Sequence, residues 1–241
     1  MEKNIKNTIF ALLLLSLSIS TVILAYLHFF ASGDGNLSGE WTANLDMTEQ
    51  AAAAALGWLQ DIEAVSVSLE DTEAYMQGLT VQVNLTLEQT ASSEGTFCCN
   101  VLPESYDACN QAAYESFARA FRELLAERLR MAGYEGELDE ESVEALVVET
   151  FGMSTVSYLM SCAPALLPSM EELQAQYDGG GTYQTEEGIL TRQFDADQAA
   201  VKSEYYIREG SRLIISGETD SVSSGSFLNR YPLIYTLDTL K

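Results

Sequence analysis

The stretch GLTVQVNLTLEQ, residues 78–89, alternates apolar and polar side chains without interruption. Leucine or valine occupies each odd position from Leu79 to Leu87, and a polar residue occupies each even position. Successive side chains of a β-strand point to opposite faces, so this strand has one face on a core and the other in water. An antiparallel sheet or barrel provides that environment. The stretch therefore predicts a protein built from half-buried antiparallel strands.

Further strand signals lie on both sides of this stretch, and helical signals lie between them. Turn residues 186–188 and 209–211 each separate two short strand-like runs, which predicts two hairpins. Ser169 and Glu172 have the spacing of a capping box, and Gly133 is a plausible helix stop. Strands are predicted at residues 38–46, 65–69, 78–89, 96–100, 182–185, 189–194, 204–208, 212–216 and 230–237. Helices are predicted at residues 47–61, 110–132, 139–164 and 170–177.

These elements define the expected architecture of the chain. The fold class is α+β: an N-terminal transmembrane helix, then an antiparallel β-barrel of about eight strands. A helical insertion, residues 103–178, interrupts the run of strands. Helices grouped between strands, with no repeating βα alternation, are typical of α+β proteins.

Residues 9–30, IFALLLLSLSISTVILAYLHFF, contain no Asp, Glu, Lys or Arg. A helix of this length spans a bilayer core at about 1.5 Å per residue. Lys3 and Lys6 precede it and no Lys or Arg follows until Arg119, so we expect a cytoplasmic N-terminus and an extracytoplasmic domain. The alternative is a signal peptide that is cleaved near Gly33, which would release the protein. The expected segments are a cytoplasmic tail (1–8), a transmembrane helix or signal anchor (9–30), a linker (31–37) and the domain (38–241).

Composition limits the partners of this domain. The chain has 12 Lys and Arg against 36 Asp and Glu, a formal net charge of −24. Nucleic acids and anionic membrane surfaces both attract the opposite charge, so we expect no nucleic-acid partner. At 47% apolar residues, the chain has enough hydrophobic side chains to build a core.

The four cysteines lie in the part of the chain placed outside the cell. They are candidates for two disulfides, because extracytoplasmic compartments are oxidising. Adjacent cysteines rarely bond to each other, which favours Cys99–Cys109 with Cys98–Cys162, or the same pairs with Cys98 and Cys99 exchanged. The alternative is four free thiols. No C-x-x-C motif and no nearby histidine indicates a redox or metal site, so no metal is expected.

Catalytic signals are absent from the sequence pattern. The only histidine, His28, lies in the N-terminal apolar segment, which excludes histidine-based acid–base catalysis in the domain. Neither a G-x-S-x-G nor an S-x-x-K motif occurs. Carboxylates such as Asp195, Asp197, Glu186 and Glu187 fit solvated turns, and catalysis by carboxylates alone is the remaining alternative. We expect a protein that is not an enzyme and needs no cofactor.

Two motifs carry a resemblance to a known family. Gly39-Glu40-Trp41 is a G-x-W on the first predicted strand, and the chain closes with YPLIY at residues 231–235. Together with the GTY and GILT runs within residues 181–194, they resemble lipocalin-like (calycin-type) domains of bacterial cell surfaces, which are uncharacterised. The resemblance implies a barrel in which Trp41 plugs the closed end beneath Arg230, by stacking of guanidinium on indole. The helical insertion departs from the plain barrel of that family.

Two functions follow from this architecture as expectations. Aromatic residues of the C-terminal strands are suited to lining a small-ligand pocket. The first expectation is that the barrel binds an apolar or amphipathic small molecule at the cell surface. The alternative is a non-catalytic interaction or structural module of the cell envelope that contacts a protein partner through the inserted helices. The candidate ligand-binding residues are Tyr183, Phe194, Tyr206 and Tyr235.

Overall fold

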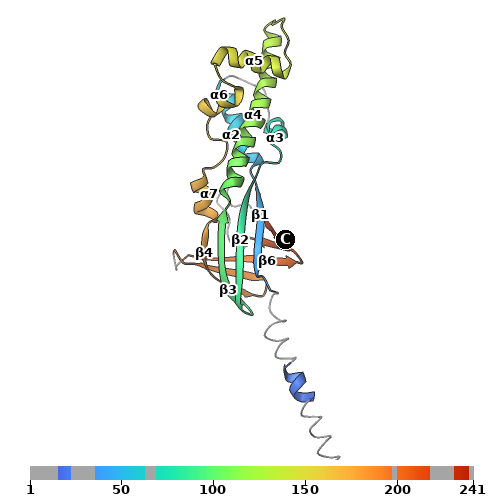
Figure 1. The fold of residues 1–241 in the computed structure, drawn as a ribbon, viewed down its shortest axis with the longest axis vertical. Coiled ribbons are helices and arrows are strands. Elements are labelled where there is room, and N and C mark those ends of the chain that lie inside the picture. Colours follow the sequence, from blue (N-terminus) through green and yellow to red (C-terminus); the bar gives the residue numbers. More distant parts are fainter. Residues whose placement is uncertain (1–15, 23–35, 63–68, 197–199, 218–230, 239–241) are drawn as a thin grey trace, which may run out of the picture.

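The computed structural model describes residues 16–22, 36–62, 69–196, 200–217 and 231–238. Eight strands form a closed antiparallel barrel in which each strand pairs with the next along the chain. The barrel closes where β8 pairs with β1, with Tyr235 opposite Ala43. The predicted barrel of about eight strands is confirmed (Figure 1). The strands are β1 (Gly39–Asp46), β2 (Thr80–Ala91), β3 (Glu94–Val101), β4 (Gly179–Glu186), β5 (Ile189–Phe194), β6 (Val201–Glu209), β7 (Arg212–Ser216) and β8 (Leu233–Leu237).

Strand β2 has the two faces that its sequence predicts. Val81, Val83 and Leu85 are fully buried in the barrel, whereas Thr80 and Glu88 are exposed on the outside. The strand pairs with β1 on one side and β3 on the other. Its apolar face therefore contributes to the barrel core along most of its length.

Both predicted hairpins are confirmed. Glu187 and Gly188 join β4 to β5 with φ values of 49° and 80°, as expected of a two-residue turn whose central residues both have positive φ. Gly210, with φ of 60°, begins the turn from β6 to β7. These turns fix the register of two strand pairs, β4 with β5 and β6 with β7.

Two helices lie between β1 and β2, and four lie between β3 and β4. The first pair is α2 (Thr48–Ile62) and α3 (Leu69–Tyr75). The insertion consists of α4 (Pro103–Met131), α5 (Glu140–Phe151), α6 (Thr155–Cys162) and α7 (Met170–Tyr177). The capping box of Ser169 and Glu172 at the start of α7 is present.

Three predicted elements differ from the structure. The strand predicted at residues 65–69 is wrong at Leu69, which begins α3; residues 65–68 lie outside the described residues. Helix α4 begins at Pro103 because proline is well suited to the first turn of a helix. The helix predicted over residues 139–164 is broken, because Gly152 ends α5 in the left-handed conformation (φ 74°) and Ser154 caps a new helix, α6.

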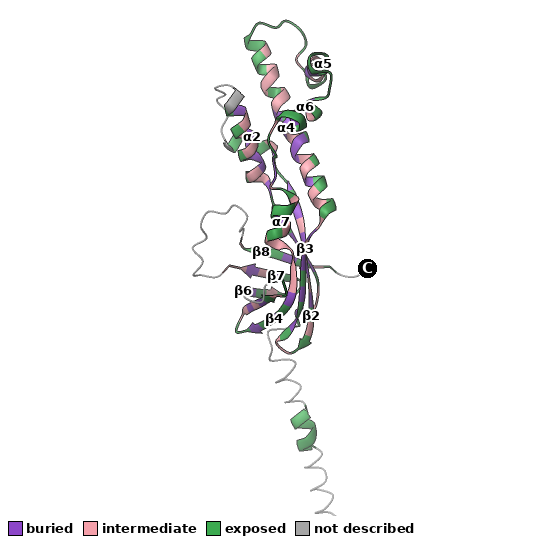
Figure 2. Cartoon of the chain, turned by 90° about the vertical axis from the view of Figure 1, so that its left-hand side faces the viewer, coloured by how far each residue is buried: buried purple, intermediate pink, exposed green. Residues whose placement is uncertain are grey.

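Helix α4 carries the chain away from the barrel (Figure 1). At 29 residues it is about 43 Å long. Helices α2 and α3 lie beside it, and α5 and α6 lie toward its outer end. We refer to α2, α3, α4, α5 and α6 as the arm. Figure 2 shows that the middle of α4 is buried, while its outer turns are exposed or half-buried. One hydrophobic core runs from the barrel into the arm, which makes the two parts a single packed unit.

Most of the predicted membrane segment, residues 9–30, lies outside the described residues. Residues 16–22 are described, and they are helical. Within the described ranges, no single helix has the length and apolar composition needed to cross a membrane. Helices α5 and α6 meet those criteria only when taken together, and they are bent by 52° relative to each other.

Candidate functional site

The candidate ligand-binding residues are brought together in the barrel. Tyr183 on β4, Tyr206 on β6 and Tyr235 on β8 all point inward and are buried. Phe194 is half-buried and packs edge-on against Phe97, with ring centroids 5.2 Å apart. The sequence therefore identified residues that share one interior. None of the three tyrosines is more than 6% exposed, so their side chains are in contact with other barrel residues.

A buried ion pair lies inside the barrel, and the sequence analysis missed it. Arg192 on β5 donates from Nε to Glu204 Oε2 on β6 at 3.0 Å, and its Nη2 also contacts that oxygen. Glu204 is 1% exposed; its Oε1 also lies 3.2 Å from Lys202 Nζ and accepts a hydrogen bond from the Tyr231 hydroxyl. The sequence could have indicated this pair, because alternate residues of a strand point to the same face. Arg192 lies two residues after the inward Leu190, and Glu204 lies two residues before the inward Tyr206.

The environment of this pair keeps it ionised. Burial alone would raise the pKa of Glu204, but the charges of Arg192 and Lys202 and the Tyr231 hydrogen bond lower it overall. Burial and the Glu204 charge raise the pKa of Tyr231. Burial also raises the pKa of Cys99 to about 11 and that of Tyr235 well above its ordinary value. These groups therefore keep their protonation states around neutral pH, as suits a structural cluster better than proton transfer.

The indole of Trp41 is fully buried and held by two partners. Its Nε1 donates to the carbonyl oxygen of Leu37 at 2.8 Å, and the guanidinium of Arg208 lies 5.7 Å from the ring centroid. Arg208 also donates to the carbonyl of Asn36. Arg230, the predicted stacking partner, lies outside the described residues. Among the described residues, the cation at Trp41 is Arg208, which lies on β6 two residues after Tyr206.

All four cysteines are free thiols, so the predicted disulfides are wrong in this structure. Cys98 and Cys99 are adjacent on β3 and therefore point to opposite faces, with Cys98 exposed and Cys99 buried in the barrel. Cys109 is buried on α4 and Cys162 is exposed at the end of α6. Among the described residues, no group of histidine, cysteine and carboxylate side chains is arranged to hold a metal ion.

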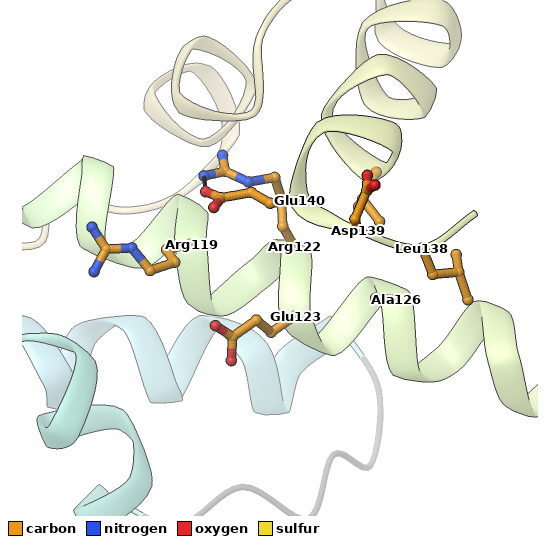
Figure 3. Close-up of a pocket in the computed structure, with 8 residues that line it drawn as sticks. Arg119, Arg122, Glu123, Ala126, Leu138, Asp139 and Glu140 are labelled. Atoms are coloured by element: carbon orange, nitrogen blue, oxygen red, sulfur yellow. Dashed lines mark hydrogen bonds and ion pairs between the residues drawn. The ribbon is translucent and has the colours of Figure 1, made fainter.

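A charged cluster joins three helices of the arm, and Figure 3 shows its Arg122 and Glu140 side chains. Arg122 on α4 contacts Glu140 at 2.5 Å and Glu144 at 3.0 Å, both on α5. Glu144 in turn accepts hydrogen bonds from the backbone N–H and the hydroxyl of Thr155 at the start of α6, at 3.0 and 2.6 Å. Burial would raise the pKa of Glu144, but the Thr155 and Arg122 contacts lower it overall. The cluster therefore fixes how α5 and α6 sit on α4.

Aromatic rings continue this bracing across the arm. Trp58 on α2 packs edge-on against Phe117 of α4 with centroids 5.6 Å apart, and Phe121 lies 6.3 Å from Tyr158 on α6. Tyr158 stacks on Phe151, the last residue of α5, at 4.3 Å. Ring pairs at these distances contribute beyond their burial. They connect α2, α4, α6 and α5 in sequence.

The outer helices of the arm expose apolar side chains. Val148 and Phe151 on α5, Met153 in the bend and Met160 on α6 are each at least 40% exposed. A groove of about 580 Å³ also lies between α2, α3 and α4. Its lining includes Leu59 and Leu124 together with acidic side chains such as Glu127. The arm thus presents both an apolar end and a partly apolar groove.

Comparison with protein-family models, with curated proteins and with solved structures gives no match. The class of the protein is therefore defined by its own geometry: a closed eight-stranded antiparallel β-barrel with a helical arm, in which α2 and α3 lie between β1 and β2, and α4, α5 and α6 lie between β3 and β4.

Proposed function

We propose that the chain is a non-catalytic interaction module whose arm contacts a protein partner while the barrel serves as its base. The observation that carries this proposal is the exposure of Val148, Phe151, Met153 and Met160 on the outer helices of the arm. Exposed apolar side chains that gather in one region mark interaction surfaces more often than isolated ones do. Methionine is also frequent on binding surfaces, because its side chain adapts to the partner.

The bracing of the arm supports the same proposal. Glu144 links Arg122 to Thr155, and Tyr158 links Phe121 to Phe151, so α5 and α6 are held in one arrangement. A surface that is ordered before binding loses less conformational entropy when the partner arrives. The structure thus favours a preformed contact surface.

The proposal includes a place for the module in the cell. Residues 9–30 anchor the chain in the membrane and the domain lies on the extracytoplasmic side, as the apolar segment and the two preceding lysines indicate. The module is lipocalin-like: the closed barrel, and Trp41 beneath a guanidinium, support that relationship. In this setting α4, which is about 43 Å long, carries α5 and α6 away from the barrel (Figure 1).

Binding of a small apolar ligand inside the barrel is the second candidate. It is favoured by the hydroxyl of Tyr183, a buried group that has no hydrogen-bond partner among the described residues. A buried polar atom of this kind costs free energy unless a water or a ligand satisfies it. The low exposure of Tyr206 and Tyr235 weighs against a large ligand, because their surfaces are already covered.

Site-specific photocrosslinking in the cells that produce the protein tests the first candidate. A benzophenone amino acid replaces Met153 or Met160 on the arm, and Thr96 or Thr182 on the outside of the barrel as matched exposed positions. We expect both arm positions to give an adduct with the same protein, and the barrel positions to give none. Adducts of equal yield at all four positions, or none at the arm, would contradict the proposal. Native mass spectrometry of the purified chain tests the second candidate, which requires a bound small molecule.

A further inference from the structure

The outside of the barrel carries a row of isoleucines. Ile207 on β6 lies opposite Ile214 on β7, and Ile214 lies opposite Ile234 on β8, so the three form one line across three strands. Ile207 and Ile234 are 58% and 52% exposed. Tyr205 and Val201, on the same face of β6, are 44% and 58% exposed. We call this surface, Val201, Tyr205, Ile207, Ile214 and Ile234, the isoleucine wall.

The outer faces of β2 and β3 show that a strand of this barrel does not need apolar residues at its outward positions. The outward positions of β2 and β3 are mostly threonine, glutamine and asparagine, such as Gln82, Thr86 and Thr96. A strand with one face in water alternates apolar and polar residues, and β2 does so. Strand β6 reverses this arrangement, because Tyr205 and Ile207 lie on its outer face and a charged residue, Glu204, lies on its inner face. Apolar side chains that gather on an exposed strand face are typical of a surface that another molecule covers.

The described helices leave this wall open. They pack on the barrel chiefly at other strands, with α4 against β2 and α7 against β3. Because the barrel is closed, β6, β7 and β8 have no free edge at which another chain could add a strand. Any partner of the wall therefore packs on it face to face.

Charge identifies the chemistry of that partner. On β6, the outward side chains from Val201 to Ile207 include no carboxylate. The next outward acid on this strand is Glu209, which lies opposite Arg212 beside the turn. A cationic partner gains nothing from such a surface. An anionic lipid surface requires Lys or Arg, and the chain as a whole carries −24. A second copy of the wall matches it, because both surfaces are apolar and uncharged and a twofold axis can bring two identical surfaces together.

We propose that two copies of this chain associate through their isoleucine walls. The association is weak, because three strands about 4.8 Å apart and a few residues long form a face well below the roughly 800 Å² per partner of a stable dimer. A dissociation constant in the micromolar range or above is expected. Salt strengthens the association by screening the repulsion between two strongly acidic chains.

Sedimentation equilibrium of the full-length chain in a density-matched detergent tests this proposal. We expect a monomer–dimer equilibrium whose dissociation constant falls when salt is raised. The double substitution Ile207→Lys/Ile214→Lys should raise it about tenfold or more. Thr96→Lys/Thr182→Lys is the matched control, because these two exposed residues also lie opposite each other and gain the same charge. We expect the control to change the constant less than about twofold.

The milder variant Ile207→Thr/Ile234→Thr keeps β-branched residues at both positions and covers the case in which the lysine variant does not fold. It should weaken association in the same direction. A chain that remains monomeric up to millimolar concentration, or a dimer equally weakened by the control, overturns the proposal. Two further results would overturn the proposal, because each means that something else covers the wall. One is binding to anionic vesicles that depends on Ile207, and the other is protection of Tyr205 from labelling in the monomer.

Discussion

At the scale of single residues, the barrel is distinguished by a charge pair where an apolar core is expected. Arg192 and Glu204 are both nearly inaccessible to solvent, and each satisfies the other. A buried pair contributes little compared with a well-packed apolar pair, but the loss of one partner leaves an uncompensated charge in a medium of low polarity. We therefore expect the pair to contribute more to the specific pairing of β5 with β6 than to the free energy of unfolding.

We predict that Glu204→Gln lowers the free energy of unfolding by about 3 kcal/mol, because it leaves Arg192 buried without a counter-charge. Urea denaturation followed by circular dichroism measures this change. Glu88→Gln, at an exposed position of β2, is the control and should have little effect. The further change Arg192→Met in the Glu204→Gln background should restore part of the loss. If the free energy of unfolding does not recover, the loss is due to the missing carboxylate itself and not to the unpaired charge of Arg192.

The same residue predicts a pH dependence. The folded-state pKa of Glu204 lies below its unfolded value of about 4.3, so its carboxylate stabilises the fold above that value. The contribution is lost as the pH falls from about 4.3 through the lower folded-state pKa. The difference in unfolding free energy between the natural chain and Glu204→Gln should therefore shrink on acidification below about pH 4. A difference that is constant from pH 6 to pH 3 would contradict the assigned ionisation.

The cysteines give a second prediction at this scale. Burial raises the pKa of Cys99 and of Cys109 to about 11 each, while Cys98 and Cys162 are exposed. The thiolate is the species that reacts with alkylating reagents. Iodoacetamide at pH 8 should label Cys98 and Cys162 within the folded chain and leave Cys99 and Cys109 intact until urea is added. Peptide mass spectrometry reads out each site, and Cys98 and Cys99 serve as adjacent internal controls.

At the residue level, the sequence predicted which aromatic side chains of the C-terminal strands share an interior. Tyr183, Tyr206 and Tyr235 were chosen because aromatic residues are suited to lining a pocket, and all three take inward positions of their strands. Arg192 and Glu204 point inward as well, but a charged side chain contradicts the usual pattern of an inward position. Which arginine meets Trp41 depends on a contact between β1 and β6, and such long-range contacts have no local signal.

At the scale of elements, the arm depends on joints between its helices. Glu144 is the central joint, since it binds α4 through Arg122 and α6 through Thr155. Helices as short as α6 are marginal in isolation and rely on tertiary contacts. The orientation of the exposed apolar end therefore depends on a few polar contacts.

We predict that Glu144→Gln destabilises α5 and α6 by about 1–2 kcal/mol, because two of its hydrogen bonds and its ion pair lose the carboxylate charge. Hydrogen exchange with mass spectrometry should show faster exchange over residues 140–162 and unchanged exchange in β2. Glu141→Gln, an exposed acid in the same helix, is the control. If hydrogen exchange is accelerated equally in both variants, the negative charge of α5 as a whole, and not the contacts of Glu144, holds these helices in place.

The break between α5 and α6 shows why element boundaries are difficult to predict. Apolar residues continue from Val147 through Leu159, so the pattern favours one helix. The break depends on Gly152 in a left-handed conformation and on the hydroxyl of Ser154 accepting from the backbone N–H of Ser157. Glycine and serine also occur inside helices, and the contact of Thr155 with Glu144, which favours the bend here, is tertiary and has no local signal. By contrast, β2 and the hairpins were predictable because alternation and turn residues are local.

At the scale of the whole molecule, residues that precede the first strand are part of the packed core. Leu37 is 2% exposed, and its carbonyl and that of Asn36 hold Trp41 and Arg208. Asn36 and Leu37 therefore contribute to the packed fold, although they lie within the predicted linker of residues 31–37.

We predict that removal of residues 1–35 leaves a folded chain with an unchanged unfolding midpoint, whereas removal of residues 1–38 lowers stability by about 2–3 kcal/mol. The longer deletion removes the buried Leu37 side chain and the acceptors of Trp41 and Arg208. Circular dichroism and urea denaturation of the two truncated chains, compared side by side, measure the difference. Equal stability of the two would show that the entry segment is not part of the core.

The insertion of helices α4, α5, α6 and α7 between two paired strands, β3 and β4, has a consequence for how such proteins diversify. Cys99 near the end of β3 lies opposite Gly179 at the start of β4, so the chain leaves and re-enters the barrel at neighbouring points, about 5 Å apart. A lineage can lengthen, shorten or replace the excursion without shifting the hydrogen-bonding register of a single strand. The barrel can therefore serve as a constant scaffold for different insertions. Homologous chains should vary most in length between Cys99 and Gly179.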